Sequence, residues 1–189
     1  MKDILASASP RRRELLSALG LNFEVRPALG EEHPEAGLSG GETAKRLSCA
    51  KCLEVAALAG EDDVVIAADT VVCLDDEILG KPADEADAAR MLRALSGRGH
   101  RVFTGVTVAR GGKVLSDYEE TAVHFRPLTE REIAAYVATG EPMDKAGAYG
   151  IQGRASLFVR GIEGDYFNVV GLPLCKLGQM LKELGVDLI

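Results

Sequence analysis

The residues with the clearest chemical potential stand where a short apolar segment leads into a helix. Ser7 and Ser9 precede three consecutive arginines at positions 11–13. A helix N-terminus offers unpaired N–H groups and the positive end of a dipole, and arginine adds bidentate contacts to phosphate. Successive helical residues are about 100° apart, so at most two of the arginines can face one site. We interpret this junction as an anion site; the alternative is an ordinary capped helix with a solvated basic turn.

A second candidate is the pair Asp69-Thr70, which directly follows a continuous apolar run at residues 64–68. Such a run is typical of a strand that is covered on both faces. An acid in or at the end of a buried strand is costly unless it is paired, protonated or bound to metal. The sequence therefore predicts general-base or metal-binding chemistry at Asp69, with a structural aspartate as the alternative.

Two glycine-bearing segments could contact a ligand. Lys81 lies between Gly80 and Pro82 on a stiff turn, where it could present a fixed cation to phosphate or simply be a solvated loop lysine. In residues 145–153, three glycines surround one tyrosine and Gln152. The Gln152 amide carries both a donor and an acceptor and could read a base edge, although a tight surface turn would explain the same pattern.

Other polar clusters have weaker signals. The run Glu31-Glu32-His33 could hold a metal but is more typical of a solvated loop. His100 and His124 fall in or beside predicted strands and are expected to be structural. The pair at positions 49 and 52 is the only CxxC spacing and lies in a predicted helix, so we do not expect a zinc site there.

The elements that must position these residues alternate between strands and helices. Period-2 and period-3.6 patterns, with caps at Ser9, Asp84 and Thr129, predict an α/β fold with a large mixed sheet. Residues 27–41 lack periodicity and suit an active-site loop. The strands are predicted at residues 4–6, 23–25, 64–72, 102–109, 114–115, 121–125, 158–160 and 167–170, and the helices at 10–19, 42–59, 84–95, 129–140 and 173–185.

Composition limits the class of protein. The chain has 189 residues, 47% hydrophobic and 27% charged, which fits one globular domain over residues 1–189. A net charge of -7 argues against stable nucleic-acid binding, so any anionic ligand must meet a local basic cluster. With four scattered cysteines, no secretory signal and no long apolar run, we expect a reduced, cytoplasmic protein without a membrane span.

Taken in order, the motifs resemble the Maf family of nucleoside triphosphate pyrophosphatases. The resemblance covers nearly the whole chain, and the segment at 146–153, AGAYGIQG, is similar to the branch that acts on dTTP and UTP. The matching segments are LASASPRRRELL at 5–16, the Glu31-Glu32 loop, AADTVV at 67–72, LGKP at 79–82, LSG at 95–97, KAGAYGIQG at 145–153 and NVVGLP at 168–173.

The resemblance implies a two-lobed α/β fold with a large twisted mixed sheet and a deep cleft, shared with the inosine triphosphate pyrophosphatases. It also implies a cytoplasmic homodimer that depends on a divalent metal, Mg²⁺ or Mn²⁺. Asp69 matches the family's proton acceptor, and Asp69 with Glu32 would hold the metal. The remaining matched positions line the site (Ser7, Ser9, Arg12, Lys51, Lys81) or are tied to substrate choice (Arg11, Thr70, Gln152).

The function that follows is hydrolysis of dTTP and UTP, and of modified pyrimidine nucleotides, to the monophosphate and pyrophosphate by attack of water at the α-phosphorus. Such an enzyme could keep modified nucleotides out of nucleic acids or take part in arresting cell division. Two alternatives remain: a nucleotide-binding regulator of septum formation, and a sister-branch enzyme acting on 7-methyl-GTP.

Overall fold

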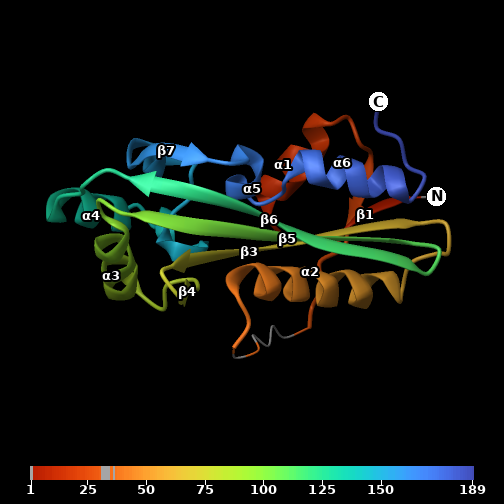
Figure 1. Ribbon diagram of the computed structural model, residues 1–189, viewed down its shortest axis with the longest axis horizontal. Coiled ribbons are helices and arrows are strands. Elements are labelled where there is room, and N and C mark those ends of the chain that lie inside the picture. Colours follow the sequence, from red (N-terminus) through yellow and green to blue (C-terminus); the bar gives the residue numbers. More distant parts are fainter. Residues whose placement is uncertain (1, 31–34, 36) are drawn as a thin grey trace.

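The computed structural model describes residues 2–30, 35 and 37–189, and a seven-stranded mixed sheet runs through them (Figure 1). The strand order is β2-β1-β3-β5-β6-β7, and β4 pairs with β3 off this path. β1 is parallel to both β2 and β3, whereas the other pairings are antiparallel, so the predicted mixed sheet is confirmed. The strands are β1 (Asp3–Leu5), β2 (Phe23–Val25), β3 (Val64–Leu74), β4 (Glu77–Leu79), β5 (Gly99–Arg110), β6 (Lys113–Phe125) and β7 (Val159–Glu163).

Three long strands, β3, β5 and β6, extend from one end of the molecule to the other (Figure 1). β3 is one continuous strand that includes Asp69, and nearly all of its residues are buried, as its apolar run predicts. The predicted turn between β5 and β6 is confirmed: Gly111 and Gly112 both have positive φ, 55° and 77°, which glycine adopts without steric cost.

The helices cover both faces of the sheet. In Figure 1, α2 lies on one face of the long strands, and α1 and α6 lie on the other. The predicted cap at Asp84 and the capping box of Thr129 with Glu132 are confirmed, whereas α2 begins earlier than expected because Ser39 accepts from the Glu42 amide. The helices are α1 (Pro10–Ala18), α2 (Gly40–Ala56), α3 (Glu85–Leu95), α4 (Glu130–Val137), α5 (Tyr166–Val170) and α6 (Leu174–Glu183), with 3-10 turns η1 (Glu141–Asp144), η2 (Ala146–Ala148) and η3 (Gly153–Leu157).

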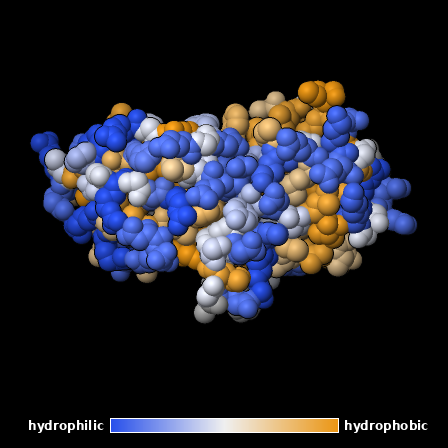
Figure 2. All heavy atoms as spheres, in the orientation of Figure 1, coloured by the Kyte–Doolittle hydropathy of each residue, from blue (hydrophilic) through white to orange (hydrophobic). Residues whose placement is uncertain are grey.

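The molecule has two lobes, each with its own hydrophobic core, and the long strands run through both. In one lobe, α1 and α6 pack on one face of the sheet through Leu16 and Leu177, and α2 packs on the other through Cys52 and Val55. In the other lobe, α3, α4 and the 3-10 turns enclose a third core. Figure 2 shows hydrophilic residues across both halves of one face, with hydrophobic residues gathered more on the half that contains α1 and α6.

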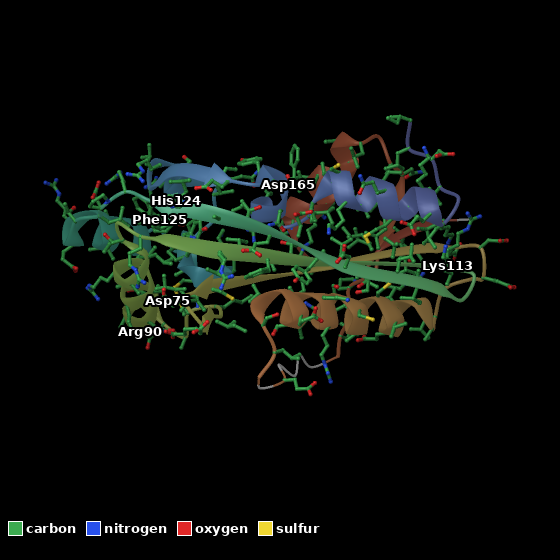
Figure 3. All side chains as sticks on the ribbon, in the orientation of Figure 1. Asp75, Arg90, Lys113, His124, Phe125 and Asp165 are labelled. Carbon is green, nitrogen blue, oxygen red and sulfur yellow. The ribbon has the colours of Figure 1, made fainter. Side chains whose placement is uncertain are left out.

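Two local predictions were wrong. Residues 167–170 are not a strand but most of α5, because the Asp165 side chain accepts a hydrogen bond from the Phe167 amide and starts a helical turn. Asp165 lies over the middle of the sheet (Figure 3). Ser9 occupies the N-cap position of α1, but its side chain makes no capping hydrogen bond; its own amide donates to the Ser7 hydroxyl over 3.2 Å.

Across the part of the chain that the structure describes, none of the helices combines the length and apolar composition needed to cross a membrane.

Candidate active site

The candidate site lies where one edge of β3 lacks a neighbouring strand. β1 pairs with β3 only as far as Ile66, and β4 begins to pair with it at Val72. β5 pairs with the opposite edge of β3 through this stretch. Among the described residues, positions 67–71 therefore have no strand on the first edge. A cleft of about 650 Å³ opens there, and residues of both lobes line it.

The cleft brings together nine of the ten residues singled out from the sequence. They come from the N-terminal junction, α2, β3, the turn after β4 and the glycine-rich segment, and their chemical roles stay predictions. They are Ser7, Ser9, Arg11, Arg12, Lys51, Asp69, Thr70, Lys81 and Gln152. The tenth, Glu32, lies outside the described residues, as do Glu31 and His33.

Asp69 is one of two acids that line the cleft among the described residues. It lies in the middle of β3 rather than at a strand end, and its side chain is paired with the Lys51 ammonium. The two side chains are only 11% and 20% exposed, so the pair satisfies the condition that a buried acid needs a compensating charge. This pairing places a carboxylate and a cation together at the edge of the cleft.

The close approach of α2 to the sheet makes that pairing possible. Gly105 of β5 stands opposite Asp69 in the strand register, and a side chain at Gly105 would collide with the α2 backbone at Ala44 and Lys45. Glycine therefore lets the helix lie directly on β5. Lys51 then projects to the edge of the sheet, on the same helical face as Leu47.

Arg12 is fixed by contacts from three parts of the chain. Its Nε donates to the Gly171 carbonyl over 2.7 Å, and its terminal nitrogens donate to the hydroxyls of Ser7 and Thr70, both over 3.1 Å. Gly171 has a φ of 127°, which favours glycine. These contacts hold the guanidinium at the cleft wall beside the start of α1.

Thr70 is the link between Arg12 and the interior of the sheet. Its hydroxyl is 2.9 Å from that of Thr104, which donates to the Asn168 carbonyl over 2.8 Å. The Asn168 amide in turn donates to the Val102 carbonyl over 3.0 Å. A chain of polar contacts therefore runs from α5 along one face of the sheet to the arginine.

The other lobe supplies the facing wall. Lys81 follows β4, and the backbone on its N-terminal side is tied to η2 because the Gly147 amide donates to the Gly80 carbonyl over 3.0 Å. Gln152 lies between Ile151 and η3 and is exposed to the cleft. The glycine-rich segment is thus a cleft wall rather than an isolated surface turn.

Sequence reasoning missed Asp144 in this wall, and it included Lys145 in the glycine-rich segment without giving it a role. Lys145 donates to the Asp144 carboxylate over 2.7 Å, and this hydrogen bond is the main cause that lowers the pKa of Asp144; the charge of Arg11 lowers it further. Thr43 was also missed, although its spacing of four residues from Leu47, and of eight from Lys51, could have shown that all three share one helical face.

The cleft is cationic although the chain is acidic. Among the described lining residues, five side chains are cationic and two are acidic, whereas the chain as a whole carries a net charge of -7. Clefts lined by one sign of charge concentrate ligands of the opposite sign. The cationic residues are Arg11, Arg12, Lys51, Lys81 and Lys145, and the acidic ones are Asp69 and Asp144.

The remaining histidine and cysteine predictions can be placed. His100 is buried and its Nε2 lies 2.6 Å from the Tyr149 hydroxyl, beneath the glycine-rich wall. His124 pairs with Glu163 at the surface, and both cysteines of the CxxC spacing are free in α2. Within the described residues, no three His, Cys, Asp or Glu side chains are grouped as a metal site.

Comparison with known proteins identifies the family of this chain. The model of the family described as Maf-like protein matches residues 2–184. A dTTP/UTP pyrophosphatase of Pelotomaculum thermopropionicum is 52% identical, with 100% of both chains covered. Another, from Alkaliphilus oremlandii, is 55% identical over 95% of this chain and 94% of the relative.

A solved dITP/XTP pyrophosphatase of Mycobacterium abscessus overlaps 68% of this chain and 76% of its own, at 19% identity and a TM-score of 0.42, and no conclusion rests on that overlap. The match to the family model and the identity to full-length relatives are decisive, and the chain belongs to the family of Maf-like proteins.

Proposed function

We propose that this protein is a nucleoside triphosphate pyrophosphatase that hydrolyses dTTP and UTP to the monophosphate and pyrophosphate. The observation that carries the proposal is the excess of cationic side chains in the cleft of an acidic protein, because a triphosphate needs concentrated positive charge. The relatives named dTTP/UTP pyrophosphatase, which are about half identical over nearly the whole chain, support the choice of nucleotide.

We propose that Arg12, Lys51 and Lys81 bind the phosphates. Arg12 is held beside the start of α1, where the helix dipole also favours an anion. Lys51 comes from α2, on the opposite face of the sheet from α1, and Lys81 comes from the turn after β4. Ser7 and Ser9 complete this end of the cleft, where Ser7 orients Arg12.

Asp69 is the proposed proton acceptor. It would take a proton from the water that attacks the α-phosphorus, so that a new P–O bond forms while the bond from the α-phosphorus to the bridging oxygen breaks. Pyrophosphate leaves with that oxygen, and the neighbouring cations stabilise its charge. Lys51 compensates the negative charge of Asp69 before substrate binds.

A divalent cation, Mg²⁺ or Mn²⁺, fits the donor set. Asp69 offers carboxylate oxygen, the ligand type that these ions prefer, and Glu32 is the second ligand implied by the resemblance. Mg²⁺ commonly uses one or two carboxylates and completes its shell with phosphate and water oxygens. When bound, the ion would offset charge on the phosphate oxygens.

Base choice is assigned to the glycine-rich wall. Gln152 can both donate to and accept from the edge of uracil or thymine. Arg11 projects from the start of α1 into the same cleft. Thr70 acts on the substrate through Arg12, because its hydroxyl is hydrogen-bonded to that guanidinium.

The test is a nucleotide panel with product analysis. The purified protein is incubated with Mg²⁺ or Mn²⁺ and each common, methylated or modified triphosphate. Monophosphate and pyrophosphate from UTP and dTTP are expected. Diphosphate and phosphate would contradict the position of attack, and cleavage of 7-methyl-GTP alone would contradict the base assignment.

We also propose, from the resemblance alone, that the protein is a homodimer. Sedimentation velocity across a range of concentrations should give a single species at twice the monomer mass of 20.1 kDa.

A further inference from the structure

The position of Gln152 in the cleft depends on its backbone. The residue is exposed, and within the described part of the chain its side chain makes no hydrogen bond that would orient it. The flanking segment from Gly150 to Gly153 must therefore set where its amide points. The residues behind this segment decide how well it is fixed.

Glu141, at the start of η1, holds the far side of the segment. Its carboxylate accepts a hydrogen bond from the Tyr136 hydroxyl over 3.0 Å and from the Arg154 amide over 3.4 Å. A Cβ atom on Gly153 would lie 2.9 Å from one of its oxygens, and Gly153 has a φ of 70°. The backbone immediately after Gln152 therefore lies directly on this carboxylate.

Tyr136 fixes the carboxylate in turn. Burial is the main cause that raises the pKa of Tyr136, and the Glu141 carboxylate raises it further, so the hydroxyl stays protonated and donates. The Tyr136 ring is buried and packs edge-on against Phe158, with 5.1 Å between the ring centroids. Glu141 is thus anchored to the core of this lobe.

Lys145 holds the near side of the segment. Its Nζ donates to the backbone carbonyl of Glu141 over 2.7 Å, and a Cβ atom on Gly150 would lie 2.9 Å from its Cε. Gly150 and Gly153 are therefore each pressed against a fixed side chain, with Gln152 between them. Glu141 itself is not among the cleft-lining residues.

We propose that Glu141 is a positioning residue for base choice, whose carboxylate fixes the backbone after Gln152 and so aims its amide at the pyrimidine. This inference rests on the proposed function, in which Gln152 reads the base. It assigns to Glu141 an effect on selectivity rather than on phosphate binding or on proton transfer.

The experiment compares kcat/KM for UTP and CTP, which differ at the base edge alone, in Glu141→Ala, Glu141→Gln and Gln152→Ala. Glu141→Ala should lower the ratio of kcat/KM for UTP to kcat/KM for CTP by on the order of 10-fold. A displacement of a positioning group by about 1 Å can lower a reaction rate up to 100-fold. Glu141→Gln keeps an oxygen that can accept from Tyr136 and should recover part of the ratio. The contact from Lys145 to the backbone survives in both variants.

A double variant separates action through Gln152 from general damage. If Glu141 acts through Gln152, Glu141→Ala combined with Gln152→Ala loses no more selectivity than Gln152→Ala alone. Glu130→Ala removes an exposed carboxylate of α4 that pairs with Arg93, and it controls for loss of charge in this lobe. Thermal melting of each variant identifies any that fail to fold.

An unchanged UTP-to-CTP ratio in folded Glu141→Ala overturns the inference, and so do additive losses in the double variant. If the wild type hydrolyses neither nucleotide, the proposed function itself fails. That outcome differs from one in which the wild type is active and selective and Glu141→Ala keeps the same selectivity.

Discussion

Asp69 and Thr70 are adjacent in the chain, yet they serve opposite faces of the sheet. Alternation along β3 directs Asp69 toward Lys51 on α2 and Thr70 toward Arg12 on α1. Both reach one cleft because the edge of β3 is open at this point. Asp69, the proposed proton acceptor, is therefore next in the chain to Thr70, which holds a proposed phosphate-binding arginine.

Asp69→Asn tests the chemical role of the acid. The amide keeps the shape but cannot accept the proton, so we expect kcat for UTP to fall by at least about 100-fold. Nucleotide affinity, measured by titration calorimetry, should persist. Asp62→Asn, at an exposed position before β3, is the control. Near-normal turnover in Asp69→Asn would rule out its role as the base, and a division phenotype that survives without hydrolysis would favour regulation by binding.

Thr70→Val tests whether Thr70 works through Arg12. The substitution keeps the shape and removes the hydroxyl between Arg12 and Thr104. Hydrogen bonds to charged groups contribute roughly 1.5–3 kcal/mol, so kcat/KM should fall by roughly 10- to 100-fold. Thr70→Ser should restore most of it. Steady-state kinetics on UTP measure both, and equal losses in the serine and valine variants would contradict the mechanism.

Much of the site's residue content could be predicted from the sequence. Helical geometry allows at most two of the three arginines to share a site, and Arg11 and Arg12 line the cleft while Arg13 is exposed elsewhere. Asp144 could not be assigned from the sequence, because it reaches the cleft only through the fold, which brings the segment after α4 back to the site.

The packing of α2 on β5 is the main feature at the scale of elements. Gly105→Ala would place a methyl group against the α2 backbone at Ala44. Overpacking of this kind costs about 1–3 kcal/mol, and moving the helix would also pull Lys51 away from Asp69. We expect a lower melting temperature together with a loss of kcat.

Gly161→Ala provides a matched control in β7, because a Cβ atom there meets no neighbour within 4 Å. Circular dichroism melts and UTP hydrolysis would be measured for both variants. If Gly105→Ala retains wild-type stability and activity, close contact between the helix and the sheet is not what positions Lys51.

Elements were predictable where local patterns decide them. The apolar run of β3 and the capping box of α4 both formed as expected, since burial and capping act over a few residues. Residues 167–170 belong to helix α5 and not to a strand. A stretch of four residues is too short to distinguish the helical from the strand period, and the capping hydrogen bond of Asp165 favours the helix. The open edge of β3 depends on where β1 and β4 stop pairing, which no local pattern encodes.

For the whole molecule, the buried His100 links stability to pH. Burial, with a smaller effect from His124, lowers its pKa from 6.5 to about 4. Below pH 6.5 the unfolded chain therefore binds a proton that the native protein does not. Stability falls as the pH drops from 6.5 to 4, by on the order of 3 kcal/mol for this group.

Urea unfolding at pH 7 and pH 5 measures this linkage. Between pH 7 and pH 5 the unfolding free energy of the wild type should fall by about 2 kcal/mol more than that of His100→Gln, since the variant has no imidazole at this position to protonate. His124→Gln at the surface is the control, and Figure 3 shows His124 beside Phe125 near the end of β6. A difference independent of pH would mean that His100 titrates alike in both states.

The open edge of β3 also determines how quickly its amide hydrogens exchange with solvent. The Ile66 carbonyl accepts from the Ala6 amide, so even-numbered residues of β3 direct their backbone groups to this edge and odd-numbered ones to β5. The amides of Ala68 and Thr70 should therefore exchange faster than those of Ala67 and Asp69. A nucleotide bound in the cleft would cover this edge as a neighbouring strand would, and it would slow the exchange of both amides. Deuterium uptake at Ala68 and Thr70 would therefore detect nucleotide binding even without hydrolysis.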